Sequence, residues 1–202
     1  MHWNDDAAWA GDDKMIRVRC DYRLVLDNLM DLTHETFVHG ASIGQAAVAE
    51  APFVATHGDR TATVTRWMAN IDVGVAPAGS VVQPEGDKPG NRSQGVNGYV
   101  LNTITPETDK TCLYFWAFAR NYALHDQRLT HELREGVASI FREDELILEA
   151  QQQARDEHPG YSFYNLNIDA GSMWMRRLID KMIAAENGAS GRSRVIPLRS
   201  AA

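Results

Sequence analysis

The amino-acid sequence predicts an α+β domain in which helices cover one face of an antiparallel sheet. Two observations indicate this class: strand candidates follow one another up to residue 120, and helical spacing of apolar residues dominates from residue 126 onward. A run of strands followed by long helices is typical of α+β folds. The chain contains no internal repeats, so a repeat architecture is excluded.

Composition limits the classes of protein to consider. The 202 residues are 44% hydrophobic and 23% charged, which predicts one folded domain rather than a disordered chain. The net charge of -7 and the lack of a basic cluster argue against nucleic-acid binding. No apolar run approaches the roughly 20 residues that cross a bilayer, and the first residues do not resemble a signal peptide. Cys20 and Cys112 lie in apolar or alternating stretches, so we expect two core thiols in a reduced, cytoplasmic protein.

The first part of the chain predicts a lead-in, a strand and a short helix. Residues 1–13 are polar and acidic without a clear period, whereas residues 14–20 alternate apolar and basic side chains as a strand does. Asp21 is suited to cap the helix that follows. We expect residues 14–188 to form the folded domain and residues 189–202 to form a polar tail.

The middle of the chain predicts antiparallel strands. β-Branched and alternating segments lie at residues 53–57, 61–68, 98–105 and 111–120. Turn-forming residues 106–110 join the last two segments as a hairpin. Residues 74–98 are rich in glycine and proline, which predicts a long functional or mobile loop.

Helical patterns surround these strands. An Ala-rich stretch at 41–51 predicts a helical turn. Residues 126–154 follow 3.6-residue spacing until Pro159-Gly160, and residues 172–186 predict a second amphipathic helix.

One stretch concentrates chemical groups. Residues 27–40 contain two imidazoles, three carboxylates and an amide, interleaved with apolar side chains. Asn28, Asp31 and His34 recur at a spacing of three, so we expect them on one face of a helix. His39 lies five residues further, about 140° away on an ideal helix. Both histidines reach one ion only if the helix ends or loosens near residues 33–35.

Two imidazoles and one carboxylate hold a metal ion from one side and leave the other side open. Asp144 is the best third ligand, because apolar residues flank it at helical spacing. Periodicity leaves Glu143, Glu145 and Glu149 as alternatives, and we expect Asp31 to accept a hydrogen bond from a ligand histidine. Such ligands suit either Fe(II) or zinc. The same side chains also occur without a metal, as core histidines and solvated helix charges.

The spacing Asn28-x2-Asp31-x2-His34-x4-His39 resembles the catalytic domain of Rieske-type non-haem iron oxygenases. The resemblance is strongest to the vanillate O-demethylase oxygenase branch, which also contains dicamba-type demethylases. Residues 105–108, residues 114–116 and the segment 143–151 extend this similarity over most of the chain.

The resemblance implies a helix-grip fold, an antiparallel sheet wrapped on a long C-terminal helix. It assigns His34, His39 and Asp144 as ligands of a mononuclear Fe(II). It further implies that Asp31 is the electron-transfer bridge toward the Rieske cluster of a neighbouring subunit, that Asn28 is placed near the iron, and that the full-length protein is a homotrimer.

Members of this family also carry an N-terminal Rieske domain with Cys-x-His and Cys-x2-His pairs, and neither pair is present here. The [2Fe-2S] ligands are therefore absent, and we expect this chain to correspond to the catalytic domain alone. It would then be inactive without a Rieske domain and a ferredoxin or flavin reductase that takes electrons from NAD(P)H.

The reaction implied is O-demethylating monooxygenation of vanillate or a similar methoxybenzoate with O2, which yields a phenol and formaldehyde. We expect the aromatic substrate between the strands at 98–105 and 111–120 and the long helix. Asn102 and the 74–98 loop are candidates for its lining.

Two other functions fit parts of the pattern. A helix-grip domain without a metal binds an apolar ligand in its cavity, but it has no need for Asn28, Asp31, His34 and His39 together. A zinc-dependent hydrolase with the same ligands would need a general base near the metal, and Glu35 is the nearby candidate.

Overall fold

The computed structural model describes residues 6–44, 46–66, 98–160 and 164–189. Three antiparallel strands form the main sheet in the order β1-β5-β4 (β1 Ala10–Val18, β4 Gly98–Thr108, β5 Thr111–Arg120). A separate antiparallel pair consists of β2 (Phe53–His57) and β3 (Ala62–Arg66). The predicted α+β class with antiparallel sheets is therefore confirmed.

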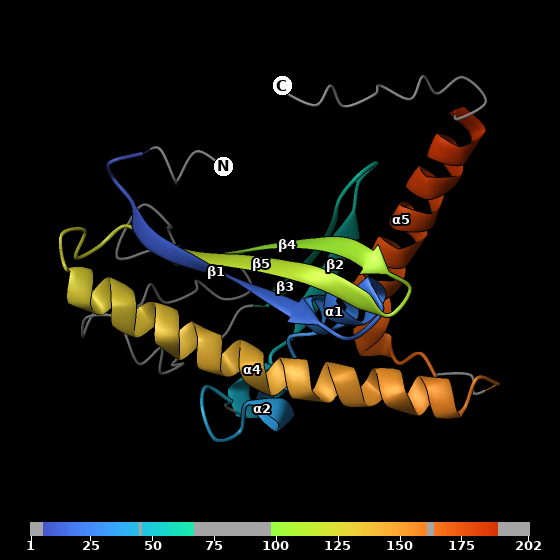
Figure 1. The fold of residues 1–202 in the computed structure, drawn as a ribbon, viewed down its shortest axis with the longest axis horizontal. Helices are drawn as coiled ribbons and strands as arrows, with labels where there is room; N and C mark the ends of the chain where they lie inside the picture. Colours follow the sequence, from blue (N-terminus) through green and yellow to red (C-terminus); the bar gives the residue numbers. More distant parts are fainter. Residues whose placement is uncertain (1–5, 45, 67–97, 161–163, 190–202) are drawn as a thin grey trace, which may run out of the picture.

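The long helix α4 (Gln127–Glu157) crosses one face of the main sheet and contacts β1 and β5 (Figure 1). Alternation along β5 turns Cys112, Tyr114 and Trp116 toward this helix, and all three side chains are buried. The rings of Tyr114 and Trp116 lie 5.3 and 5.4 Å from the ring of Phe141 in α4. This aromatic contact fixes the distance between the sheet and the middle of α4.

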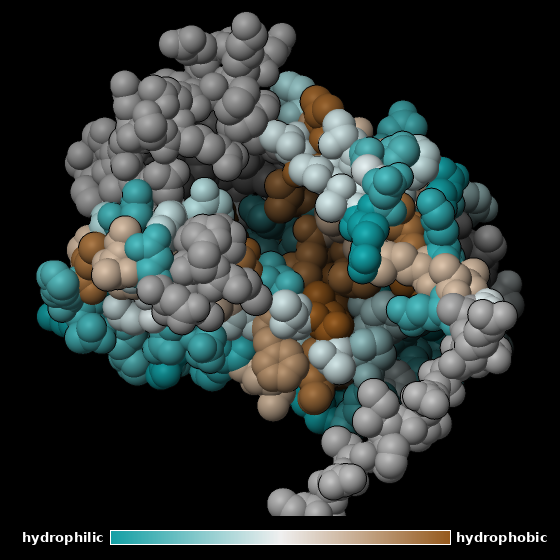
Figure 2. Space-filling model, turned by 90° about the horizontal axis from the view of Figure 1, so that it is seen from above, coloured by the Kyte–Doolittle hydropathy of each residue, from teal (hydrophilic) through white to brown (hydrophobic). Residues whose placement is uncertain are grey.

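The core continues from this contact toward the first helix. Its buried members come from β1, the link between β1 and α1, α1 itself, β5 and α4: Val18, Cys20, Leu24, Val25, Cys112, Tyr114, Trp116 and Leu148. Both cysteines are free thiols in this core, as predicted. On the molecular face shown in Figure 2, apolar side chains gather in a central hollow that polar side chains border.

Helix α1 (Tyr22–Met30) begins at the predicted cap, because the Asp21 carboxylate accepts a hydrogen bond from the Arg23 backbone N–H. The single helix predicted to carry Asn28, Asp31 and His34 is wrong in one respect. Residues 31–33 interrupt it, and a second helix, α2 (His34–Val38), begins at His34. A further short helix, α3 (Ala46–Glu50), follows in the predicted Ala-rich stretch.

The last helix, α5 (Ala170–Ala189), packs on α1 and on the β2-β3 pair. It approaches β3 so closely that a Cβ on Gly171 would lie 2.1 Å from Val64 Cγ2. The long helix of the predicted helix-grip fold is therefore α4, whereas α5 packs on α1 and on the β2-β3 pair. No helix in the described part of the chain has both the length and the apolar character to cross a membrane.

Some predicted boundaries differ from the structure. Strand β1 begins at Ala10, inside the predicted lead-in. Strand β4 continues to Thr108 through a register irregularity between Pro106 and Thr108, so the predicted turn at 106–110 is shorter. The predicted loop at 74–98 lies, apart from residue 98, outside the described residues, as do residues 190–202 of the predicted tail.

Candidate metal centre

Three side chains converge where α2 meets the middle of α4. His34 Nε2 lies 3.4 Å from Asp144 Oδ1, and His39 Nε2 lies 3.3 Å from the same oxygen. One ligand atom from each residue falls within 4.8 Å of the other two. Two nitrogens and one oxygen from segments far apart in the chain therefore surround one point.

A single helical turn presents both histidines. His34 is the first residue of α2, and His39 lies directly after its last residue, with backbone angles of φ -99° and ψ 22°. The two rings are 5.2 Å apart at an interplanar angle of 70°. Because the chain leaves helical geometry at His39, the separation of about 140° expected for an ideal helix does not apply.

Asp144 has the environment of a metal ligand. Its side chain is buried, and Oδ1 has no hydrogen-bond partner within the described residues. A buried carboxylate oxygen without a donor is costly unless a cation satisfies it. The two imidazoles and this oxygen are ligands that Fe(II) and zinc both accept, so the residues present fit a metal ion.

The same charge acts on its neighbours. Burial lowers the pKa of His34, but the nearby Asp144 carboxylate and the hydrogen bond to the Asp31 carbonyl outweigh it and raise the pKa overall. Burial, aided by the negative charge of Asp144, raises the pKa of Tyr114. The centre is thus a negative site inside the core, as binding of a cation requires.

The second nitrogen of each imidazole has a different partner. His39 Nδ1 lies 2.7 Å from Glu143 Oε2, a carboxylate. His34 Nδ1 donates to the backbone carbonyl of Asp31, whereas the Asp31 carboxylate accepts from the Thr33 N–H at 2.8 Å. Asp31 therefore accepts from a ligand histidine as expected, but it does so through its peptide carbonyl and not through its carboxylate. The Asp31 carbonyl is the partner of His34 Nδ1, and the Glu143 carboxylate is the partner of His39 Nδ1.

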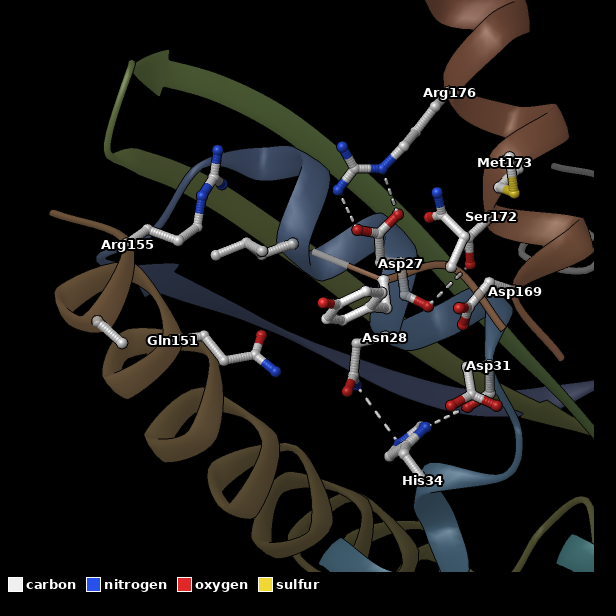
Figure 3. Close-up of a pocket in the computed structure, with 14 residues that line it drawn as sticks. Asp27, Asn28, Asp31, His34, Gln151, Arg155, Asp169, Ser172, Met173 and Arg176 are labelled. Atoms are coloured by element: carbon white, nitrogen blue, oxygen red, sulfur yellow. Dashed lines mark hydrogen bonds and ion pairs between the residues drawn. The ribbon is translucent and has the colours of Figure 1, made fainter. Parts of the chain in front are cut away.

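An open cavity of about 450 Å³ adjoins His34. Figure 3 shows side chains from α1, α4 and α5 around it, with His34 and Asp31 at one end. Asn28 also lines it, and its amide nitrogen lies 3.4 Å from His34 Nε2. The other lining residues are Leu24, Asp27, Gln151, Ala154, Arg155, Tyr164, Asn165, Asp169, Ser172, Met173 and Arg176.

The sequence did not indicate that residues of α5 line this cavity. Arg176 forms an ion pair with Asp27 there, and Ser172 Oγ donates to the Asp27 carbonyl at 3.4 Å. The spacing of Arg176 within an amphipathic helix gave no sign of this role, because the contact depends on how α5 packs on α1. The candidate Asn102 does not line this cavity and instead accepts a hydrogen bond from the Tyr114 hydroxyl at 2.7 Å.

Glu35, the base considered for a zinc hydrolase, is not among the residues that line the cavity. The competing carboxylates on α4 also have other partners. Glu149 pairs with Arg19, and Glu145 pairs with Arg142. Among the described residues, Asp144 is therefore the carboxylate that shares a point with both histidines.

The family model described as the vanillate O-demethylase oxygenase C-terminal domain matches residues 18–76 and 75–185. The chain is 36% identical to the vanillate O-demethylase oxygenase subunit of Pseudomonas sp. (strain ATCC 19151), across 94% of this chain and 67% of that protein. It is 31% identical to the toluene-4-sulfonate monooxygenase system iron-sulfur subunit of Comamonas testosteroni, across 93% and 63%.

A solved structure has a similar fold. Dicamba monooxygenase bound to 3,6-dichlorosalicylic acid superimposes with a TM-score of 0.72 at 24% identity, covering 91% of this chain and 62% of that one. In each comparison almost all of this chain aligns with about two thirds of the longer protein.

Proposed function

Because the chain belongs to the vanillate O-demethylase oxygenase C-terminal domain family, we propose that it is the iron-binding catalytic portion of an aromatic O-demethylating monooxygenase. The observation that carries this proposal is the convergence of His34, His39 and Asp144 on one point. The buried Asp144 oxygen without a donor gives the chemical reason for a cation at that point.

His34, His39 and Asp144 would hold the iron from one side. Fe(II) bound there would supply the activation of O2, so that one oxygen atom enters a methyl C–H bond of an aryl methyl ether. Two electrons from NAD(P)H and two protons convert the other oxygen atom to water. The hydroxylated ether then divides into a phenol and formaldehyde, which balances the reaction.

The chain's own residues provide positioning and shelter. Glu143 and the Asp31 carbonyl orient the two imidazoles, and the aromatic contact between β5 and α4 excludes water from the Asp144 side. The amide nitrogen of Asn28 lies 3.4 Å from His34 Nε2, so Asn28 would place a polar group at the open side of the centre.

The electron route would pass through Asp31. Its carboxylate lines the open cavity, and the peptide of the same residue contacts His34. We propose that a Rieske [2Fe-2S] domain from a neighbouring subunit of a homotrimer approaches this side, reduced in turn by a ferredoxin or flavin reductase. The chain spans 67% and 63% of the two curated relatives described above.

The substrate would be a small aromatic acid. The relatives are named for vanillate and toluene-4-sulfonate, both of which are aromatic anions. Asn102 remains a candidate for substrate binding, because the buried Tyr114 hydroxyl fixes its carbonyl oxygen and its amide nitrogen would donate to a substrate oxygen.

Metal content tests the centre. Wild-type protein prepared without oxygen and loaded with Fe(II) should bind one iron per chain, whereas His34→Ala and Asp144→Ala should bind much less. His131→Ala, which changes a histidine on the exposed side of α4, is the matched control. Equal iron binding by all four proteins would show that the ligand assignment is wrong, and zinc in place of iron after growth in iron-replete cells would favour the hydrolase.

Turnover tests the electron route separately. With vanillate, NADH and a reductase, the isolated chain should release no formaldehyde until a protein carrying a Rieske domain is added. Robust formaldehyde release without that addition would contradict the proposed need for a Rieske partner.

A further inference from the structure

His39 lies between two consecutive carboxylates of α4. Asp144 Oδ1 faces its Nε2 at 3.3 Å, and Glu143 Oε2 faces its Nδ1 at 2.7 Å. Successive helical residues point about 100° apart, so two neighbours on one helix reach opposite sides of the same ring. Resting on the metal centre proposed above, we propose that Glu143 is a positioning residue that sets the tautomer and the donor strength of His39 toward the metal.

The position of Glu143 is itself fixed. Ser42 Oγ donates to Glu143 Oε2 at 3.1 Å and contacts the His39 carbonyl at 3.2 Å. The backbone N–H groups of Ser42 and Gly44 donate to that same carbonyl at 2.9 and 2.8 Å. The carboxylate, the hydroxyl and the loop therefore form one network around His39, whose exposure is only 1%.

A carboxylate partner has chemical consequences that a carbonyl does not. A negatively charged acceptor forms a stronger hydrogen bond than a neutral one, so it holds the proton on Nδ1 and leaves the lone pair on Nε2. A carboxylate in this position also holds the ring in the orientation that a metal ligand needs. His34, bonded to a peptide carbonyl, lacks this reinforcement. The two histidines are thus unequal ligands, and Glu143 accounts for the difference.

Titration with Co(II) alone tests this role, because the absorption spectrum of bound Co(II) reports its ligand field. Glu143→Gln keeps the size of the side chain and removes its charge. We expect it to weaken Co(II) binding by about 10- to 100-fold and to shift the absorption bands. Ser42→Ala, which leaves the carboxylate but removes one of its contacts, should weaken binding less.

Glu132→Gln is the matched control, since Glu132 lies on the same helix in an exposed pair with Arg128. It should bind Co(II) as wild type does, with the same spectrum. Urea unfolding of the metal-free variants measures any structural contribution of Glu143 separately. Wild-type affinity and spectrum in Glu143→Gln, with stability alone reduced, would overturn the proposal.

Two further outcomes are distinguishable. If wild-type protein binds no Co(II) and no Fe(II), the metal centre itself is wrong. If wild-type protein binds Co(II) but Glu143→Gln does not fold, the Ser42→Ala variant provides the test. Unchanged Co(II) affinity and an unchanged spectrum in Ser42→Ala would then overturn the role of Glu143.

Discussion

The two histidines come from the same helical turn, but they lie in opposite kinds of environment. The sealed half of the centre consists of His39, Glu143, Ser42 and Gly44, where the loop after α2 closes on α4. The open half consists of His34 together with the residues of α1, α4 and α5 that line the cavity in Figure 3. His39 is buried, whereas the side chain of His34 keeps 16% of its exposure.

The difference separates two requirements of a metal site that also performs chemistry. In the sealed half a buried imidazole and its hydrogen bond to a carboxylate favour a ligand in one fixed orientation. The open half holds its polar groups around a cavity, which favours access by a substrate or an electron donor. Mutations in the sealed half should therefore lower the free energy of unfolding most, and mutations in the open half should lower it least.

The largest expected effect is that of His39→Ala. It removes a buried ring and leaves Glu143 and Asp144 without that partner, so we expect a loss of about 3–5 kcal/mol in the free energy of unfolding. His34→Ala should cost only about 1 kcal/mol, because water from the cavity replaces the ring. Urea unfolding of the metal-free proteins measures both, and equal losses would show that the two halves do not differ.

A smaller effect is expected at Gly44. A Cβ there would lie 2.5 Å from the Glu35 carbonyl oxygen and 2.9 Å from the His39 carbonyl carbon, so Gly44→Ala forces the loop away from His39. We expect a loss of about 1–3 kcal/mol and weaker metal binding.

Gly136→Ala provides the opposite test on α4, where nothing lies within 4 Å of the added Cβ. It should stabilise the helix by about 0.5–1 kcal/mol and leave metal binding unchanged. Thermal unfolding distinguishes the two variants. If Gly44→Ala unfolds at the same temperature as the wild-type protein, the loop is not close-packed on His39.

Local patterns in the sequence predicted much of this arrangement. Alternation predicted β5 at residues 111–120, Asp21 predicted the start of α1, and the motif around His34 and His39 predicted the family that the comparisons confirm. Apolar spacing around Asp144 also favoured it as the carboxylate that the structure brings to the two histidines. Each of these features depends on neighbours within one element.

Features that depend on packing between elements were not predictable. The sequence presents Glu143 as a competitor of Asp144, because periodicity says which face of α4 a residue occupies but not what covers that face. Only the docking of α2 turns Glu143 into the partner of His39. The cavity beside His34 likewise depends on α5, whose contact with α1 through Arg176 and Asp27 has no local signal.

The smallest expected effect concerns the ion pair between Arg19, which precedes α1, and Glu149 of α4. The Glu149 carboxylate accepts hydrogen bonds from the backbone and guanidinium of Arg19, just before α1. The Arg19 guanidinium outweighs partial burial and lowers the pKa of Glu149. A lowered pKa means that the pair stabilises the fold above the ordinary pKa of the carboxyl group and that this contribution is lost as pH falls through the folded value.

Because Arg19 is largely exposed, Glu149→Gln should reduce the free energy of unfolding by only about 0.5–1 kcal/mol at pH 7. Urea midpoints measured from pH 7 down to pH 3 should converge for the two proteins at the acidic end, and 1 M salt should narrow the gap at pH 7. A difference in urea midpoint that does not change with pH or salt would mean that the ion pair does not hold Arg19 against α4.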